Sequence, residues 1–155
     1  MSASSNTDRI ERCIVINAPR ERVWRAISDA EEFGTWFGVD LKGQAFVQNQ
    51  RTRGLNTACG HEDVWFDIIV DRIEPMNLLS FRWHPYAVDP AMDYSQEEPT
   101  LVTFTLTNAP GTGTLLTVVE SGFDQVPLYR RLEAFRMHGG GWDAQLGNIA
   151  RHANT

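Results

Sequence analysis

Hydrophobic and polar residues alternate along much of the chain, and this pattern predicts strands. Near the N-terminus, residues 9–18 place Ile10, Ile14 and Ile16 on one side of an extended segment, with Cys13 and Val15 on the other. Similar patterns, joined by short connections, recur in six further segments: 44–50, 51–59, 63–73, 78–83, 101–107 and 114–121. The first two are polar enough to be edge strands. We therefore expect about seven strands, antiparallel because their connections are short.

In the last three of these segments, the alternation also indicates which side chains face inward. Opposite faces of a strand receive alternate residues, so the apolar set of each strand marks its buried side. On this basis, the inward positions are Leu79, Phe81, Trp83, Val102, Phe104, Leu106, Leu116 and Val118. Glu120 has the same phase as the last two. A carboxylate is therefore expected on the apolar face, either inside a pocket with a raised pKa or close enough to the strand end to reach water.

A short helix follows the first strand. Pro19 fits the first helical position, where its missing N–H is not needed, and Glu21 falls near the free amides of the first turn. Val23, Ala26 and Ile27 then lie on one side of a helix that ends near residue 28. Residues 29–38 are expected to form a second, broken turn.

A helical stripe dominates the C-terminal segment. Its apolar or small residues recur at alternating spacings of four and three: Leu128, Leu132, Phe135, Gly139, Trp142, Leu146, Ile149 and Ala153. The phase continues through Gly139, Gly140 and Gly141, so we predict one helix from Leu128 to Ile149, about 22 residues and roughly 33 Å long. Glycine costs about 1 kcal/mol relative to alanine in a helix, so we interpret the three glycines as making room for a neighbouring element.

Composition narrows the class of protein. The chain has 155 residues, enough for one domain over 1–155 with a flexible tail at 1–8, and its net charge of -6 disfavours nucleic acid as a partner. No apolar run is long enough to span a membrane, and the N-terminus has no signal-peptide pattern, so a cytoplasmic location is expected. Cys13 and Cys59 have no metal-ligand spacing and are expected to be free and buried.

Several motifs resemble a known family. They are "INAPRERVWRAI", "DRIEPMNLLSFRW", "VTFTLT", "GTLLTVVESGF" and "GGWDAQLGNIARH", and they span about residues 9–152. They are similar to the START-like (SRPBCC) superfamily, in the branch of the C-terminal domain of the heat-shock chaperone ATPase activator. The resemblance implies an α+β helix-grip fold: a curved antiparallel sheet wrapped around a long C-terminal helix, with a short helical insert after the first strand. It also implies a cavity between sheet and helix, and a link to the stress response.

We expect this cavity to bind a small hydrophobic or aromatic ligand without catalysis, cofactor or metal. The candidate ligand-binding residues are Trp36, Phe37, Phe66, Phe81, Trp83, Phe104, Glu120, Phe135, His138, Gly139 and Trp142. Glu120 or His138 would hold a polar group of the ligand. The opposing interpretation is that the aromatic rings fill the centre solidly, as core aromatics usually do.

Other hypotheses remain open. An enzyme of the cyclase or hydrolase type could use His138 or Glu120, and a chaperone or other protein could dock on the acidic loop at 85–99, which is long enough to be a lid. His84 lies opposite Phe81 and is expected in a structural or surface role. The run at 61–63 offers too few converging ligands for a metal. Monomer and homodimer are both compatible with the sequence.

Overall fold

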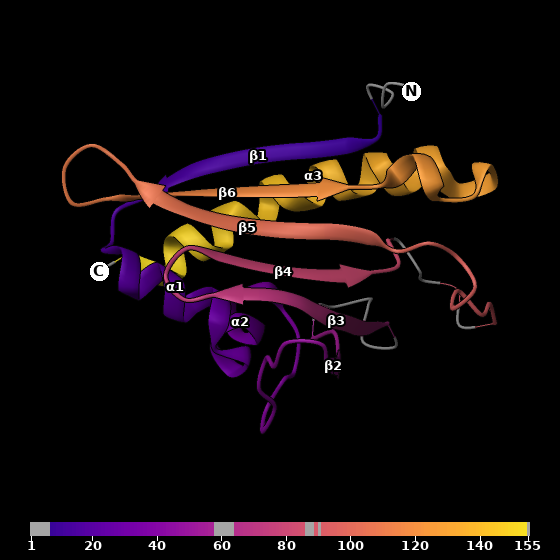
Figure 1. Cartoon of the computed structure of the whole chain (residues 1–155), viewed down its shortest axis with the longest axis horizontal. Coiled ribbons are helices and arrows are strands. Elements are labelled where there is room, and N and C mark those ends of the chain that lie inside the picture. Colours follow the sequence, from indigo (N-terminus) through magenta and orange to yellow (C-terminus); the bar gives the residue numbers. More distant parts are fainter. Residues whose placement is uncertain (1–6, 58–63, 86–88, 90, 155) are drawn as a thin grey trace.

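The computed structural model describes residues 7–57, 64–85, 89 and 91–154. Its elements, in chain order, are β1 (Arg9–Ile16), α1 (Arg20–Ser28), α2 (Ala30–Phe37), β2 (Arg51–Leu55), β3 (Trp65–Glu74), β4 (Leu78–Trp83), β5 (Thr100–Asn108), β6 (Thr114–Ser121), the 3₁₀ turn η1 (Phe123–Gln125) and α3 (Leu128–Ala153). Figure 1 shows a curved sheet with the long helix α3 lying along one of its faces.

Within the described residues, the sheet contains six strands in the order β1-β6-β5-β4-β3-β2, and every neighbouring pair is antiparallel. Strands β2 to β6 follow one another as a meander, and β1 pairs with β6, so the first strand completes the sheet beside the last. This arrangement confirms the helix-grip fold predicted from the sequence. The predicted number of about seven strands is wrong by one.

The missing strand is the segment 44–50. Its backbone forms a turn in which Gln50 N–H donates to Val47 O, and Asn49 has a φ of 68°, in the left-handed region. The next contacts run to β3, where Asn49 N–H donates to Val70 O and Val70 N–H donates to Gln50 O. A residue with positive φ interrupts an extended ladder, so this segment ends as a turn against β3.

Two helices, α1 and α2, connect β1 to the far edge of the sheet. The predicted broken turn at 29–38 is a regular helix, because the Asp29 side chain accepts a hydrogen bond from Glu31 N–H and Gly38 ends the helix with a φ of 93°. The two helices are joined by a buried hydrogen bond from Trp36 Nε1 to Ala26 O, 2.8 Å long. Thus the aromatic residues of α2 are held in fixed positions over the sheet.

Helix α3 runs unbroken through its three glycines, as predicted, and continues four residues beyond the predicted end. The interpretation of the glycines is wrong for two of them. A Cβ added to Gly140 or Gly141 would meet no atom within 4 Å, and one added to Gly139 would lie 3.4 Å from the Arg12 guanidinium. Packing therefore does not require a glycine at residues 140 and 141.

The core lies between the sheet and the three helices. Its largest fully buried side chains include Phe33, Phe81, Phe104 and Phe123. Cys13 was expected to be buried, but it is an exposed free thiol on the outer side of β1. Cys59 and the polar run at 61–63 lie outside the described residues. Among the described helices, none is long and apolar enough to cross a membrane.

Candidate functional site

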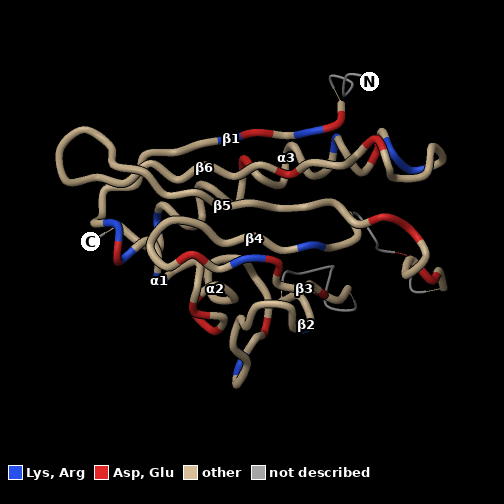
Figure 2. The backbone as a smooth tube through the Cα atoms, in the orientation of Figure 1, with Lys and Arg blue, Asp and Glu red and all other residues tan. Residues whose placement is uncertain are grey.

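The candidate site is centred on a buried carboxylate. Glu120 lies near the end of β6 and is 0% exposed. In the sheet register it stands opposite Ile10 of β1 on one side and Val102 of β5 on the other. It is the one charged residue in strands β5 and β6, both of which are described in full. Figure 2 shows the tube of β5 in tan, without charged residues. The prediction that Glu120 faces the apolar side of the sheet is confirmed, and the alternative that it reaches water is wrong.

Four side chains donate hydrogen bonds to this carboxylate. From the sheet, Trp83 Nε1 and Thr100 Oγ1 donate to Oε2, at 2.8 Å and 2.5 Å. The register explains this pair, because Trp83 and Thr100 are direct partners on β4 and β5. From helix α3, His138 Nδ1 and Trp142 Nε1 meet Oε1 at 2.7 Å and 2.8 Å. One oxygen of the carboxylate therefore binds the sheet and the other binds the helix.

These donors decide the charge of the site. Burial opposes ionisation of Glu120, but the charge of His138 and the hydrogen bonds from His138, Thr100 and Trp83 outweigh it, so the pKa of Glu120 is lowered. The direction is opposite to the raised pKa expected from the sequence, because burial alone was considered there. A carboxylate that accepts several hydrogen bonds is favoured in its ionised form. The site therefore presents a buried negative charge at neutral pH.

A group of aromatic rings adjoins the carboxylate through Trp83 and Trp142. Phe33, on α2, lies at their centre and contacts Trp36, Phe37 and Phe66 at centroid distances of 4.8, 4.9 and 5.7 Å. Trp83 and Trp142, which both bind Glu120, stack on each other at 5.8 Å. Most of the predicted site residues belong to this one group of rings: Trp36, Phe37, Phe66, Phe81, Trp83, Phe104 and Trp142.

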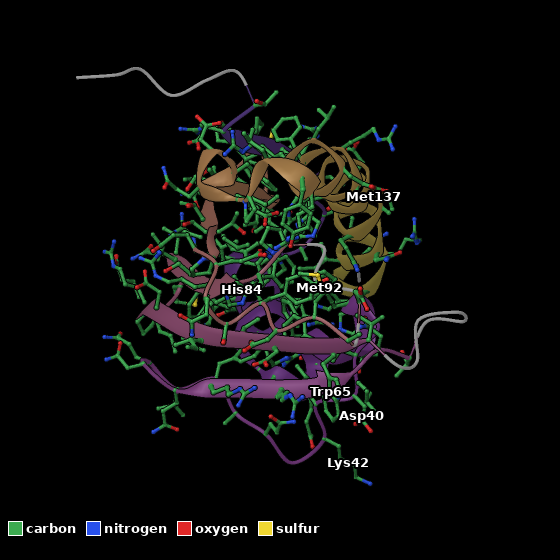
Figure 3. The ribbon with its side chains drawn as sticks, turned by 90° about the vertical axis from the view of Figure 1, so that its right-hand side faces the viewer. Asp40, Lys42, Trp65, His84, Met92 and Met137 are labelled. Carbon is green, nitrogen blue, oxygen red and sulfur yellow. The ribbon has the colours of Figure 1, made fainter. Side chains whose placement is uncertain are left out.

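The rings of this group are packed against one another, whereas the sequence predicted an open cavity between them. Edge-to-face contacts such as Phe81–Trp83 at 5.2 Å and Phe104–Trp142 at 5.7 Å show rings packed against one another. Two hollows that described residues line lie on the surface. One, of about 300 Å³, is on the first turns of α3, and the other, of about 330 Å³, includes Asp40, Lys42 and Trp65. Figure 3 shows these last three residues at the β2–β3 side, away from α3.

Three members of the site are only partly buried: Phe37, Trp83 and His138. The His138 ring lies 5.3 Å from Trp83, and Phe37 lies 6.1 Å from Trp83, so the three residues form a continuous edge. The end of α2 is tied to α3 at this edge, since Gln145 Nε2 donates to Phe37 O. We call Phe37, Trp83 and His138 the rim of the site. It is the part of the ring group that a molecule from solvent meets first.

Two predicted residues lie apart from the main group. Phe135 is half-buried against Phe123 of η1, at 5.3 Å. Gly139 is buried and faces Arg12 of β1, which forms an ion pair with Asp143. Neither residue contacts the carboxylate, although Phe123 also lies 6.1 Å from the His138 ring. Their place in the α3 stripe was predicted correctly, and a ligand-binding role for them stays a prediction.

A second polar cluster fastens the loop after β4 to the start of α3. Arg130, 8% exposed, donates from Nε to Glu97 Oε1 at 2.9 Å and also donates to Pro85 O. Tyr129 Oη donates to the other carboxylate oxygen of Glu97 at 2.9 Å, and His84 Nε2 lies 2.9 Å from Glu97 O. Burial opposes ionisation of Glu97, but the bonds from Arg130 and Tyr129 outweigh it and lower its pKa. We call Arg130, Glu97 and Tyr129 the clasp.

Several of these residues could not be chosen from the sequence. Phe33 was part of a segment expected to be a broken turn, so its central place was missed. Thr100 carries no signal, since a threonine in a strand is common. Arg130 was overlooked because an arginine at the start of a helix is usually solvated. The loop at 85–99, which contains its partner Glu97, was noticed in the sequence only because it is unusually long.

Comparison with known proteins places the chain in a family. The model of the family described as Activator of Hsp90 ATPase homolog 1-like protein matches residues 17–154. The chain belongs to this family. The match confirms the START-like (SRPBCC) assignment made from the sequence motifs. A comparison with curated proteins found no match.

Solved structures agree with the family. DynU16, a protein in the dynemicin biosynthetic locus, is 29% identical with a TM-score of 0.67, and the match covers 93% of this chain but only 46% of DynU16. The chain thus spans about half the length of that protein. Protein MLL2253 from Mesorhizobium loti is 26% identical, with a TM-score of 0.70 and coverage of 93% and 95%. The Aha1 dimer from Colwellia psychrerythraea is 15% identical, with a TM-score of 0.64 and coverage of 91% and 92%, and shares the fold.

Proposed function

We propose that the chain binds a small, mostly apolar or aromatic molecule between the sheet and α3, with a polar group of the molecule at Glu120. The helix-grip scaffold supports the proposal, because the ring group and the carboxylate lie in the layer between sheet and helix. The similarity to DynU16, a protein in a biosynthetic locus, favours a small molecule over a polymer as the ligand.

The observation that carries the proposal is the buried charge. Removing a carboxylate from water costs several kcal/mol, and even a well-paired buried ion is often no better for stability than apolar residues of similar volume. The sheet could be completed at residue 120 by a leucine or valine, as it is at residues 116 and 118. Glu120 instead brings four donors together at one point. A role in recognition accounts for this arrangement better than stability does.

Because the rings are closed, binding requires a change of conformation. The rim offers the shortest path, since Phe37, Trp83 and His138 are partly exposed and border Trp142 and the carboxylate. A ligand that binds an opened form would shift the population toward it. Its apolar part would then replace ring-to-ring contacts, and its polar part would replace one of the four donors to Glu120.

Native mass spectrometry of the gently purified protein tests the proposal first, since a retained molecule would appear as an added mass. The second arm is a thermal-shift screen of aromatic probes against the native protein, Glu120→Gln and the control Glu21→Gln. Glu21 is an exposed carboxylate on α1 and lies outside the site. Probes should raise the Tm of the native protein and of the control by several degrees, and that of Glu120→Gln by much less. Equal shifts in all three proteins would contradict binding at Glu120.

Catalysis is a second candidate, favoured by one observation. His138 Nδ1 lies 2.7 Å from Glu120 Oε1, so a buried carboxylate fixes the orientation of a partly exposed imidazole. Such a pair is suited to general acid–base chemistry. If the protein is an enzyme, incubation with its ligand should give a new product mass, and His138→Ala should abolish the product while retaining the bound ligand.

A protein partner is the third candidate. The first turns of α3 expose Leu128, Leu132 and Tyr129, with exposed fractions of 81%, 71% and 65%. Clustered apolar residues of this kind often mark protein contacts. The family's description suggests an Hsp90-type ATPase as the partner. An ATPase assay with and without the protein tests this candidate, and Leu132→Ser should remove any stimulation.

A further inference from the structure

We propose that the ligand carries a protonated amine, and that this cation binds Glu120 in place of His138. The inference rests on the proposed function and names the class of molecule: an aromatic amine, as opposed to an acid or a neutral aromatic compound. The geometry around Glu120 carries it in three steps.

The first step is the direction of the hydrogen bonds. Trp83 and Trp142 supply indole N–H groups and Thr100 supplies a hydroxyl, and all three donate to the carboxylate. Indole N–H groups can only donate, and an ionised carboxylate can only accept. A ligand acid would bring a second acceptor and a second negative charge to a point whose donors are already engaged. A ligand amine brings the donors that the carboxylate accepts.

The second step is the exchange of one donor. Thr100 is 0% exposed and Trp142 is 3% exposed, so both are enclosed. His138 has a side chain that is 18% exposed, lies on the helix just before three glycines, and approaches Glu120 from the rim. Of these three donors, His138 is the most exposed, so we take it as the one that a ligand displaces. An ammonium group that takes its place keeps one oxygen bound to the sheet and supplies a charge to the other.

The third step is the surroundings of the charge. Phe37, Phe66 and Trp142 lie near the Trp83 indole, at centroid distances of 6.1, 5.9 and 5.8 Å from it. Aromatic faces attract cations through their negative quadrupole and repel anions. A carboxylate set among such rings is suited to an amine attached to an apolar body, because the rings favour both parts.

The test uses three probes of nearly equal shape: 2-naphthylmethylamine, 2-naphthylmethanol and 2-naphthoate. Their Kd values are measured by isothermal titration calorimetry with the native protein, His138→Ala, Glu120→Gln and the charge control Glu21→Gln. The native protein should bind the amine about tenfold more tightly than the alcohol, since a charge-assisted hydrogen bond is roughly twice as strong as a neutral one. The acid should bind more weakly than the alcohol.

The variants separate the possible outcomes. His138→Ala should strengthen amine binding, because no imidazole competes for the carboxylate, and Glu120→Gln should reduce the amine to the level of the alcohol. Glu21→Gln should leave the order of the three Kd values as it is in the native protein. Equal Kd values for the three probes, or tighter binding of the acid, would overturn the amine while leaving the proposed function intact. Failure of every probe to bind both the native protein and His138→Ala would overturn the two together. If Glu120→Gln does not fold, the amine proposal is still tested by the order of the three Kd values in the native protein and by the tighter amine binding expected in His138→Ala.

Discussion

Replacing Gly140 and Gly141 with alanine should stabilise the protein. Both residues lie on the exposed side of α3, and a Cβ added to either would meet no atom within 4 Å. The substitution therefore gains helix propensity without a steric cost. At about 1 kcal/mol for each glycine, the double variant should gain about 2 kcal/mol in the free energy of unfolding. For a chain of this size, that corresponds to a rise in Tm of roughly 4–8 °C.

Two single substitutions serve as controls. Gly147→Ala lies on the same helix beyond the glycine run, where its Cβ would meet only the end of the flexible Arg151 side chain, at 3.3 Å. It should stabilise the protein by up to about 1 kcal/mol. Gly139→Ala should gain less, because its Cβ would approach the Arg12 guanidinium at 3.4 Å and Arg12 is paired with Asp143.

Thermal and urea unfolding followed by circular dichroism measure the stability, and hydrogen exchange followed by mass spectrometry locates the effect. In the double variant, amides at 128–138 should exchange more slowly, because the weak point between the two halves of α3 has been removed. In Gly147→Ala that segment should exchange as in the native protein. The reasoning is refuted if the double variant is no more stable than the native protein, or if Gly147→Ala slows exchange at 128–138 equally.

Stiffening α3 should also affect ligand entry. Glu120 is enclosed by the sheet and α3, so a molecule reaches it only after local movement of these elements. The double variant should therefore bind 2-naphthylmethylamine with a lower association rate than Gly147→Ala, as measured by stopped-flow tryptophan fluorescence. An unchanged rate would place the moving part elsewhere, at α2 or at the loop after β4.

Three further predictions concern buried groups. The pKa of Glu120 is lowered in the folded state, so its ionised form stabilises the fold above the ordinary pKa of 4.5, and this benefit is lost as pH falls through the folded-state pKa. Glu120→Gln should therefore cost about 3 kcal/mol in the free energy of unfolding at pH 7 and less in acid, as measured by urea unfolding. A cost independent of pH would contradict this. Arg130→Ala should cost about 3 kcal/mol and speed proteolysis within residues 91–99, because it leaves Glu97, whose side chain is 11% exposed, without its cation. Unchanged proteolysis would argue against the clasp. Phe33→Ala should cost about 3–5 kcal/mol, whereas Trp65→Ala, at a site 47% exposed, should cost far less; similar costs would show that Phe33 is not the centre of the core.

The sequence predicted the parts of this fold that depend on periodicity. The inward faces of β4, β5 and β6 followed from alternation, because a strand next to a core must bury every second residue. The length of α3 followed from an apolar stripe that kept its phase across three glycines. Segment 44–50 shows where periodicity fails: Phe46 is buried and Val47 is exposed, as in a strand, but Asn49 turns the chain.

The site was only half predictable, for a physical reason. Glu120 and Trp142 were candidates because each lies on an inward face of its own element, and His138 because it lies one residue from the apolar stripe of α3. Their meeting, however, depends on how α3 crosses the sheet, and this relation between distant segments leaves no periodic trace. Likewise, the balance between ring volume and the space under a helix is set by rotamers, so a list of large aromatics could not distinguish an open cavity from a filled one.

The division of the carboxylate between two layers gives the closed structure a way to open. If His138 turns away at the rim, Oε1 loses one of its two helix donors while it keeps Trp142, and Oε2 keeps Trp83 and Thr100. The carboxylate would then remain fixed in place with one hydrogen bond missing, and a missing hydrogen bond at a buried charge is costly. A donor supplied by a ligand would restore the missing contact. The carboxylate that holds α3 against the sheet in the closed form would therefore also stabilise a bound molecule that takes the place of His138, which joins the packing of this fold to its proposed function.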